Sequence, residues 1–349
     1  LYGLLTLGTM FTVEAAVALV TAGLAKHLLG LEASPVTISA GVIALSVTLL
    51  ALGRYHWLDR ITKGVVAVLT ICTLIATALA LGKLDGLELS LWPTLGSLEA
   101  EDYFFIAALV GWMPSAIDVS VWQSLWTLAR SRDTGHRPSL RDSSFDFHVG
   151  YVATGVLALC FLTLGAAVMQ GQELAPQPAA FAAQVVELYA ATLGAWSRPI
   201  IALAAFLVMF STTLTVVDGF PRALVVLLAR FDGPEPEAGA AGQGEADTSR
   251  RAYWGGLLLL GAGSVIVLDL ALAPGEGGGP PPFKAMIDLA TILSFLTAPI
   301  LSWLNHRAVL GPEVPARSRP RPWLRWASLG GILAQAALAL YYVWLRFLS

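Results

Sequence analysis

Residues 199–217 read PIIALAAFLVMFSTTLTVV, an apolar run without a charged side chain. A helix needs about 20 predominantly apolar residues to cross the hydrocarbon core of a bilayer. This run is long enough to do so, and it is too long for a core segment of an ordinary soluble domain. It therefore predicts a membrane-spanning helix.

Eight further segments share this character, and the composition agrees with them. Hydrophobic residues make up 56% of the chain and charged residues 13%, against roughly 25% charged residues in soluble domains. We expect an all-α integral membrane protein with one transmembrane domain over residues 1–349. Residues 181–194 predict a short amphipathic helix along the interface. The nine expected spans are 3–28, 35–53, 61–82, 103–129, 148–170, 197–229, 252–272, 284–305 and 323–347.

Basic residues alternate between the two ends of these spans. Cytoplasmic loops are enriched in Lys and Arg, so the richer side predicts the cytoplasm. We therefore expect a cytoplasmic N-terminus and an external C-terminus in an inner or plasma membrane. The loops after the second, fourth, sixth and eighth spans carry Arg54, Arg60, Lys63, Arg130, Arg132, Arg137, Arg141, Arg230, Arg250, Arg251, Arg307, Arg317, Arg319, Arg321 and Arg325.

Several function classes find no support in the sequence. A net charge of −3 gives no reason to expect a nucleic-acid partner. Cys72 and Cys160 lie in separate apolar runs and are interpreted as small buried hydrophobes. There is no zinc-type His/Cys cluster, no phosphate-binding glycine loop and no nucleophile elbow. We expect neither a cofactor nor an enzymatic activity, and the oligomeric state stays open.

Glu14 is a carboxylic acid in the middle of the first span, within MFTVEAAVALV (10–20). Ionisable residues at membrane depth are costly and face the bundle interior. Two interpretations stand: a proton or ion relay, or a protonated Glu that bonds to a neighbouring helix.

The fourth span contains GWMPSAIDVSVWQS (111–124). Pro114 cannot donate a backbone hydrogen bond, so the carbonyl of Val110 is freed at membrane depth. Broken helices supply carbonyls to ions in transporters, and the thioether of Met113 suits a borderline transition metal. Together with Asp118 this predicts a metal site; the alternative is a proline kink beside a core methionine.

Asp218 lies in FSTTLTVVDGFPRAL (210–224), where we expect Gly219 and Pro221 to break the helix. It is a second candidate for proton or ion coupling. Arg222 follows four residues later, so an ion pair within the helix is the alternative.

These motifs resemble the Nramp family of divalent-metal transporters. MPSAIDVSVWQS (113–124) is similar to that family's sixth-helix signature, M-P-H-N-L-Y-L-H-S. RYHWLDRITK (54–63) is similar to the start of its fifth helix, and FSTTLTVVDG (210–219) to its eighth. The resemblance runs along the whole chain, from the family's third helix to its eleventh.

The resemblance implies a fold and roles for individual residues. The fold is the inverted-repeat arrangement also seen in LeuT. Metal would be held by the thioether of Met113 and the carbonyl of Val110, and Glu14 would take part in proton transfer. Phe11 stands where the family has an acid.

Departures from the family pattern are substantial. Ser115 and Ser120 replace two histidines, Ala116 replaces an asparagine, and Asp118 occupies an aromatic position. The family's metal-binding Asp-Pro-Gly-Asn is absent from the sequence, together with the first two helices. We therefore expect a divergent member whose gene continues upstream.

The leading hypothesis is proton-coupled transport of Mn²⁺ or Fe²⁺ by alternating access. Metal and protons would be cargo, with the lipid bilayer as the other partner. An organic-substrate carrier of the same fold is the first alternative, although a thioether adds little to the binding of an amino acid. A non-transporting membrane protein is the second alternative, and the intramembrane acids argue against it.

Overall fold

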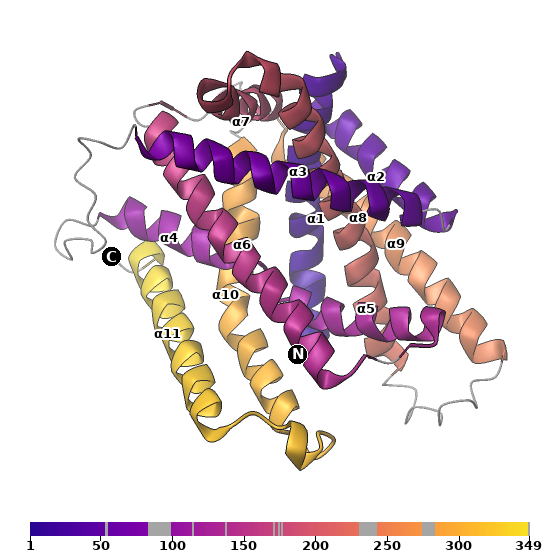
Figure 1. Ribbon diagram of the computed structural model, residues 1–349. Coiled ribbons are helices and arrows are strands. Elements are labelled where there is room, and N and C mark those ends of the chain that lie inside the picture. The colour runs from indigo at the N-terminus through magenta and orange to yellow at the C-terminus, as the bar shows by residue number, and fades with distance from the viewer. Residues whose placement is uncertain are drawn as a thin grey trace. The chain divides into compact units, whose positions relative to one another are not determined.

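In the computed structural model, shown in Figure 1, every regular element of the described residues is a helix. The described residues are 1–52, 55–82, 99–113, 115–136, 138–169, 172–173, 175, 177–229, 243–273 and 283–347. The helices are α1 (Tyr2–Leu29), α2 (Pro35–Ala51), α3 (Tyr55–Leu81), α4 (Ala100–Trp112), α5 (Val119–Thr134), α6 (Leu140–Val168), α7 (Pro178–Leu193), η1 (Ala195–Ser197), α8 (Arg198–Ala229), α9 (Gln243–Ala271), α10 (Phe283–Leu310), η2 (Ala316–Ser318) and α11 (Pro322–Phe347).

Seven helices in the described part of the chain are long and apolar enough to cross a bilayer. They are α1, α3, α6, α8, α9, α10 and α11, and each coincides with an expected span. Large apolar side chains on them are exposed, such as Leu162 at 66% and Leu340 at 71%. Such a surface suits lipid, so the protein is a multi-pass membrane protein.

Two of the nine expected spans differ from the prediction. α2 is apolar but has 17 residues, which makes it shorter than the seven long helices. The expected span 103–129 is divided, because α4 ends at Trp112 and α5 begins at Val119. The interruption predicted in this segment is therefore confirmed, although Pro114 itself lies outside the described residues.

The break expected at Gly219 and Pro221 is wrong. α8 continues through both residues, which are buried. Pro221 packs against α9 at Gly256, where an added Cβ would lie 3.2 Å from the proline Cβ. Neighbouring helices can hold a transmembrane helix together across one missing hydrogen bond, and this contact supplies such support.

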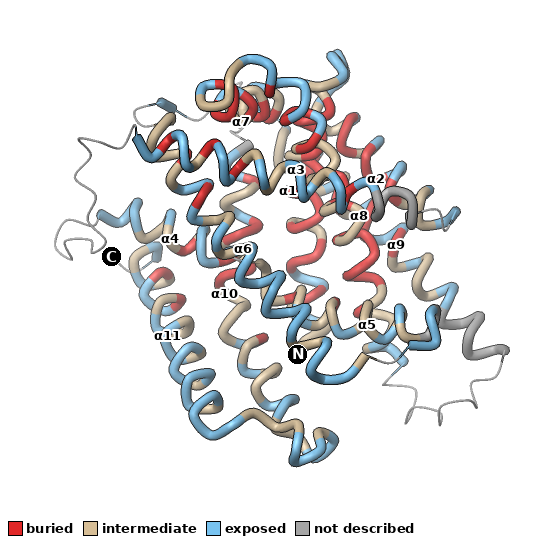
Figure 2. The backbone as a smooth tube through the Cα atoms, in the orientation of Figure 1, coloured by how far each residue is buried: buried red, intermediate tan, exposed pale blue. Residues whose placement is uncertain are grey.

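The chain forms two compact units. Unit 1 contains Gly3–Leu87 and Val156–Ile287, and unit 2 contains Glu88–Gly155 and Asp288–Ser349. Figure 2 shows that buried residues gather on α1, α7 and α8 of unit 1, whereas α11 of unit 2 is mostly exposed.

Close contacts of α1 organise unit 1. The hydroxyl of Thr21 lies 2.9 Å from that of Thr213 on α8. Ser39 on α2 donates to the carbonyl of Ala18 at 3.4 Å. A Cβ added at Gly23 would lie 2.6 Å from the carbonyl oxygen of Pro178 on α7, so glycine is required at this crossing.

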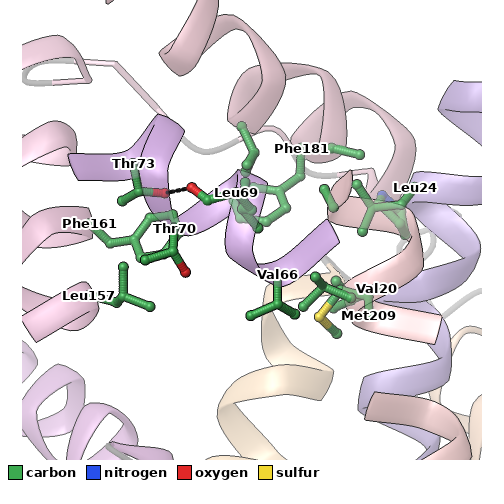
Figure 3. A pocket seen from close by; sticks show the side chains of 15 residues that line it. Val20, Leu24, Val66, Leu69, Thr70, Thr73, Leu157, Phe161, Phe181 and Met209 are labelled. Carbon is green, nitrogen blue, oxygen red and sulfur yellow. Dashed lines mark hydrogen bonds between the residues drawn. The ribbon is translucent and has the colours of Figure 1, made fainter. Parts of the chain in front are cut away.

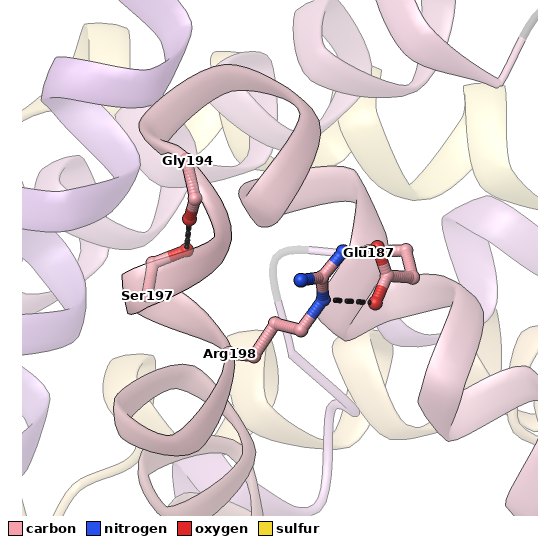
Figure 4. A network of polar contacts seen from close by, with 4 residues as sticks. All are labelled: Glu187, Gly194, Ser197 and Arg198. Carbon is pink, nitrogen blue, oxygen red and sulfur yellow. Dashed lines mark hydrogen bonds and ion pairs between the residues drawn. The ribbon is translucent and has the colours of Figure 1, made fainter.

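The predicted helix near residues 181–194 is present as α7, and a tight joint connects it to α8 (Figure 4). Arg198 donates from Nε to Glu187 Oε1 at 2.5 Å and from a terminal nitrogen to Oε2 at 2.8 Å. Ser197 donates to the carbonyl of Gly194 at 2.8 Å. The guanidinium lowers the pKa of Glu187 below its ordinary value.

Candidate functional site

The interruption between α4 and α5 lies in unit 2 and carries the candidate metal residues. Met113 is the C-cap residue of α4, and its backbone is extended. The chain then turns tightly, because the N–H of Val119 bonds to the carbonyl of Ala116 at 3.2 Å and that of Ser120 to Ile117 at 3.1 Å. Asp118 is the N-cap residue of α5. Val110, Met113 and Asp118 therefore all lie in one short segment of the chain.

Asp118 is the buried member of this set. Its residue exposure is 3%, and no group within the described residues donates a hydrogen bond to its buried Oδ1. Met113 and Val110 remain 40% and 37% exposed. A buried carboxyl oxygen without a donor favours either a proton or a cation nearby. Asp118 is therefore the member of this set that could respond to a positive charge.

α10 fixes both sides of the interruption. Gly111 packs so closely on α10 that an added Cβ would lie 2.0 Å from the carbonyl oxygen of Thr291. Trp112 donates from Nε1 to the hydroxyl of Ser294 at 2.9 Å. On the other side, Asn305 donates from Nδ2 to the hydroxyl of Ser120 at 2.7 Å.

Sequence reasoning missed the roles of Ser294 and Asn305. The two residues are eleven positions apart, which is close to three helical turns, so they share one face of α10. A search for polar side chains at helical spacing in that span could have found this face.

A polar cavity of about 830 Å³ lies along α5 and the start of α6 in the same unit. Ser120, two residues after Asp118, is among its lining residues. Its polar lining includes Gln123, Arg130, His136, Asp142, Asp146 and His148.

Glu14 lies on α1 in unit 1 and is fully buried. Among the described residues, neither of its carboxylate oxygens has a hydrogen-bond partner. Close by along the helix, Phe11 packs into α9 at Gly263, where an added Cβ would lie 2.4 Å from the ring. The hydroxyl of Ser264 is likewise buried without a partner among those residues. Glu14 thus retains the features of a protonated acid or a relay.

Asp218, also in unit 1, is held in a polar cluster. Arg222 donates to its Oδ1 at 2.7 Å and to its Oδ2 at 3.0 Å. Tyr253 on α9 donates its hydroxyl to Oδ1 at 2.5 Å, and the guanidinium lies 5.7 Å from the centre of the Tyr253 ring. The predicted ion pair within the helix is confirmed, and it favours a structural role that joins α8 to α9.

No group of three His, Cys, Asp or Glu side chains that could hold a metal ion occurs in the described part of the chain. The candidate donors at the interruption are instead of mixed type: a thioether, backbone carbonyls and one carboxylate. Such a set suits transient binding of cargo better than a permanent structural metal.

One comparison with known proteins gives a relative. The chain is 32% identical over 337 residues to the uncharacterized protein PM0681 of Pasteurella multocida (strain Pm70). The match covers 94% of this chain and 71% of that protein. The chain belongs to the family of PM0681. No model of a known protein family matches the chain, and no solved structure matches it.

Proposed function

We propose that the protein is a secondary transporter of divalent metal ions of the Mn²⁺ and Fe²⁺ class, a divergent relative of the Nramp transporters. The observation that carries the proposal is the interruption between α4 and α5, with Asp118 buried beside it and Met113 at its start. Interrupted helices in transporters place carbonyls and helix ends at the substrate.

The donors at the interruption have distinct roles in this proposal. The sulfur of Met113 gives selectivity for a borderline metal over Mg²⁺ or Na⁺. The carbonyl of Val110 is available because residue 114, four positions later, is a proline without an N–H. Asp118 supplies the negative charge that offsets part of the cost of dehydrating the ion.

Glu14 is proposed as the proton-coupling residue, because its carboxyl group is fully buried in unit 1. A buried acid without donors is stable when neutral and can exchange a proton with each transport cycle. Asp218 is the weaker candidate, since Arg222 already balances its charge. The proposed arrangement is a LeuT-type inverted repeat in the cell membrane, with a cytoplasmic N-terminus and an external C-terminus.

An organic-substrate carrier of the same fold is the second candidate. The helix interruption and the polar cavity beginning at Ser120 would serve an amino acid equally well. The soft sulfur of Met113 favours the metal. A non-transporting membrane protein would have no evident use for the buried acid groups of Glu14 and Asp118.

Uptake into vesicles separates these functions. The protein is reconstituted into liposomes, and uptake of Mn²⁺ is compared with uptake of a mixture of labelled amino acids. We expect saturable Mn²⁺ uptake that increases when a proton gradient is imposed. Uptake of amino acids without Mn²⁺ would support the second candidate. Mn²⁺ uptake that does not change when the proton gradient is imposed would contradict the coupling role of Glu14. It would still support metal transport.

A further inference from the structure

Unit 1 contains an apolar cavity of about 410 Å³, separate from every residue discussed so far as a site. Side chains from α1, α3, α6, α7 and α8 surround it (Figure 3). The polar side chains among its lining residues are Thr70 and Thr73. Thr73 donates to the carbonyl of Leu69 at 2.8 Å and shares a 2.7 Å hydrogen bond with the hydroxyl of Tyr189. The wall is therefore almost entirely hydrocarbon.

Neither water nor empty space suits this cavity. A buried water needs about two to four polar partners, and this wall offers very few. An empty cavity of such size forfeits the dispersion contacts of every atom that lines it. An apolar occupant from the membrane would restore those contacts.

The two sides of the cavity differ in what lies behind them. Val66 on α3 and Phe161 on α6 are 41% and 44% exposed, on helices long enough to span the bilayer. Leu24 on α1 and Ala182 on α7 are 5% and 3% exposed. One wall is thus a lipid-facing surface and the other belongs to the core of unit 1.

We propose that this cavity binds one acyl chain of a membrane phospholipid. An acyl chain is flexible and purely apolar, and the bilayer presents it at high concentration next to α3 and α6. Bound there, it would fill the space between these lipid-facing helices and the core helices α1 and α8. The proposal is independent of the cargo that the protein carries.

Photolabelling tests the proposal directly. The protein is reconstituted into phospholipid vesicles in which part of the lipid carries a diazirine at the end of one acyl chain. After irradiation, labelled residues are found by mass spectrometry. We expect label on the inner wall, at Leu24 and Met209, as well as on the exposed Leu162. Leu164 is 0% exposed and measures background labelling. Labelling of Leu24 and Met209 that does not exceed the labelling of Leu164 would overturn the proposal.

Variants that fill the cavity give the second arm. Ala205→Phe places a ring in the space from α8, and Val185→Phe does so from α7. Leu203→Phe, at a position 48% exposed on the same helix as Ala205, is the matched control. We expect the filling variants to lose label on Leu24 and keep it on Leu162, whereas the control keeps both. Inner-wall labelling that persists in both folded filling variants would contradict an acyl chain in this cavity.

Discussion

The carboxyl group of Asp118 is buried at the interruption between α4 and α5, 3% exposed at the residue level. Its Oδ1 has no donor among the described residues, and burial of such a group favours a proton or a nearby cation over a bare carboxylate. Asp218 differs, since it already has an arginine as its partner. We therefore expect replacement by asparagine to affect transport differently at Asp118 and at Asp218.

We predict that Asp118→Asn impairs Mn²⁺ uptake more than Asp218→Asn does. The first change removes a charge available to cargo, whereas the second removes one that Arg222 balances. Initial rates in proteoliposomes measure the difference, after normalising for the amount of folded protein. Equal losses in the two variants would contradict the site at the interruption.

The absence of a Cβ atom at Gly111 allows α4 to pack closely on α10. Replacing a glycine within a helix by alanine ordinarily stabilises it by up to about 1 kcal/mol. At Gly111 the added Cβ would lie 2.0 Å from the Thr291 carbonyl oxygen. We predict that Gly111→Ala lowers the melting temperature in detergent. Gly331→Ala on α11, with nothing within 4 Å of its added Cβ, is the control and should not lower it. A Gly111 variant as stable as this control would refute the close packing of α4 on α10.

At the scale of elements, a polar cluster ties α8 to α9. Tyr253 donates to Asp218, whose carboxylate also binds Arg222. Hydrogen bonds to charged groups contribute about 1.5–3 kcal/mol. We therefore predict that Tyr253→Phe lowers stability by about 2 kcal/mol, measured by thermal unfolding in detergent. Tyr151→Phe, on the exposed surface of α6, is the control; a Tyr253 variant that unfolds like this control would show that the hydroxyl does not hold the two helices.

The joint between α7 and α8 should respond to acid. Binding to Arg198 lowers the pKa of Glu187 below its ordinary value of 4.5. The ion pair therefore contributes above pH 4.5 and is lost as the pH falls through the lowered pKa. The pair is exposed, so the effect is small. The difference in melting temperature between the parent and Glu187→Gln should shrink on acidification. A difference that is constant with pH would contradict the pair.

The sequence predicted long helices well and helix continuity less well. Apolar length alone located seven of the expected spans, because a bilayer crossing requires a run that few other structures contain. The interruption after Trp112 was predicted from Pro114, whereas the break at Gly219 and Pro221 was wrong. Both are proline positions, but α8 packs its proline on Gly256. Such a contact between distant segments cannot be read from the local sequence.

The candidate site could also be predicted only in part, because some of its residues are identified by local sequence and others by contacts between distant segments. Asp118 and Glu14 stood out because acids in apolar runs are rare, and the structure buries both. The partnership of α10 with the interruption was missed, because Ser294 and Asn305 are common residues whose role depends on the helix opposite. For Asp218 the structure shows the alternative interpretation, the ion pair with Arg222, since a spacing of four residues brings two side chains together on a helix.

At the scale of the whole molecule, the protein is a multi-pass membrane protein for which we propose metal transport. The candidate donors of the interruption lie in unit 2, and the buried acid proposed for coupling lies in unit 1. Alternating access by relative movement of bundles is the mechanism that such a division of roles would support. The claim depends on the binding of metal at Met113.

Mn²⁺ uptake by Met113→Ala is the most direct test of that claim. The parent, this variant and Met169→Ala are compared in the same liposomes at equal protein density. Met169 follows α6 and packs against an apolar cluster of unit 1, so it controls for the loss of a methionine elsewhere. We predict that loss of the sulfur ligand lowers Mn²⁺ uptake at least about tenfold, while Met169→Ala transports like the parent. Full Mn²⁺ uptake by Met113→Ala, or none by the parent, would contradict the account.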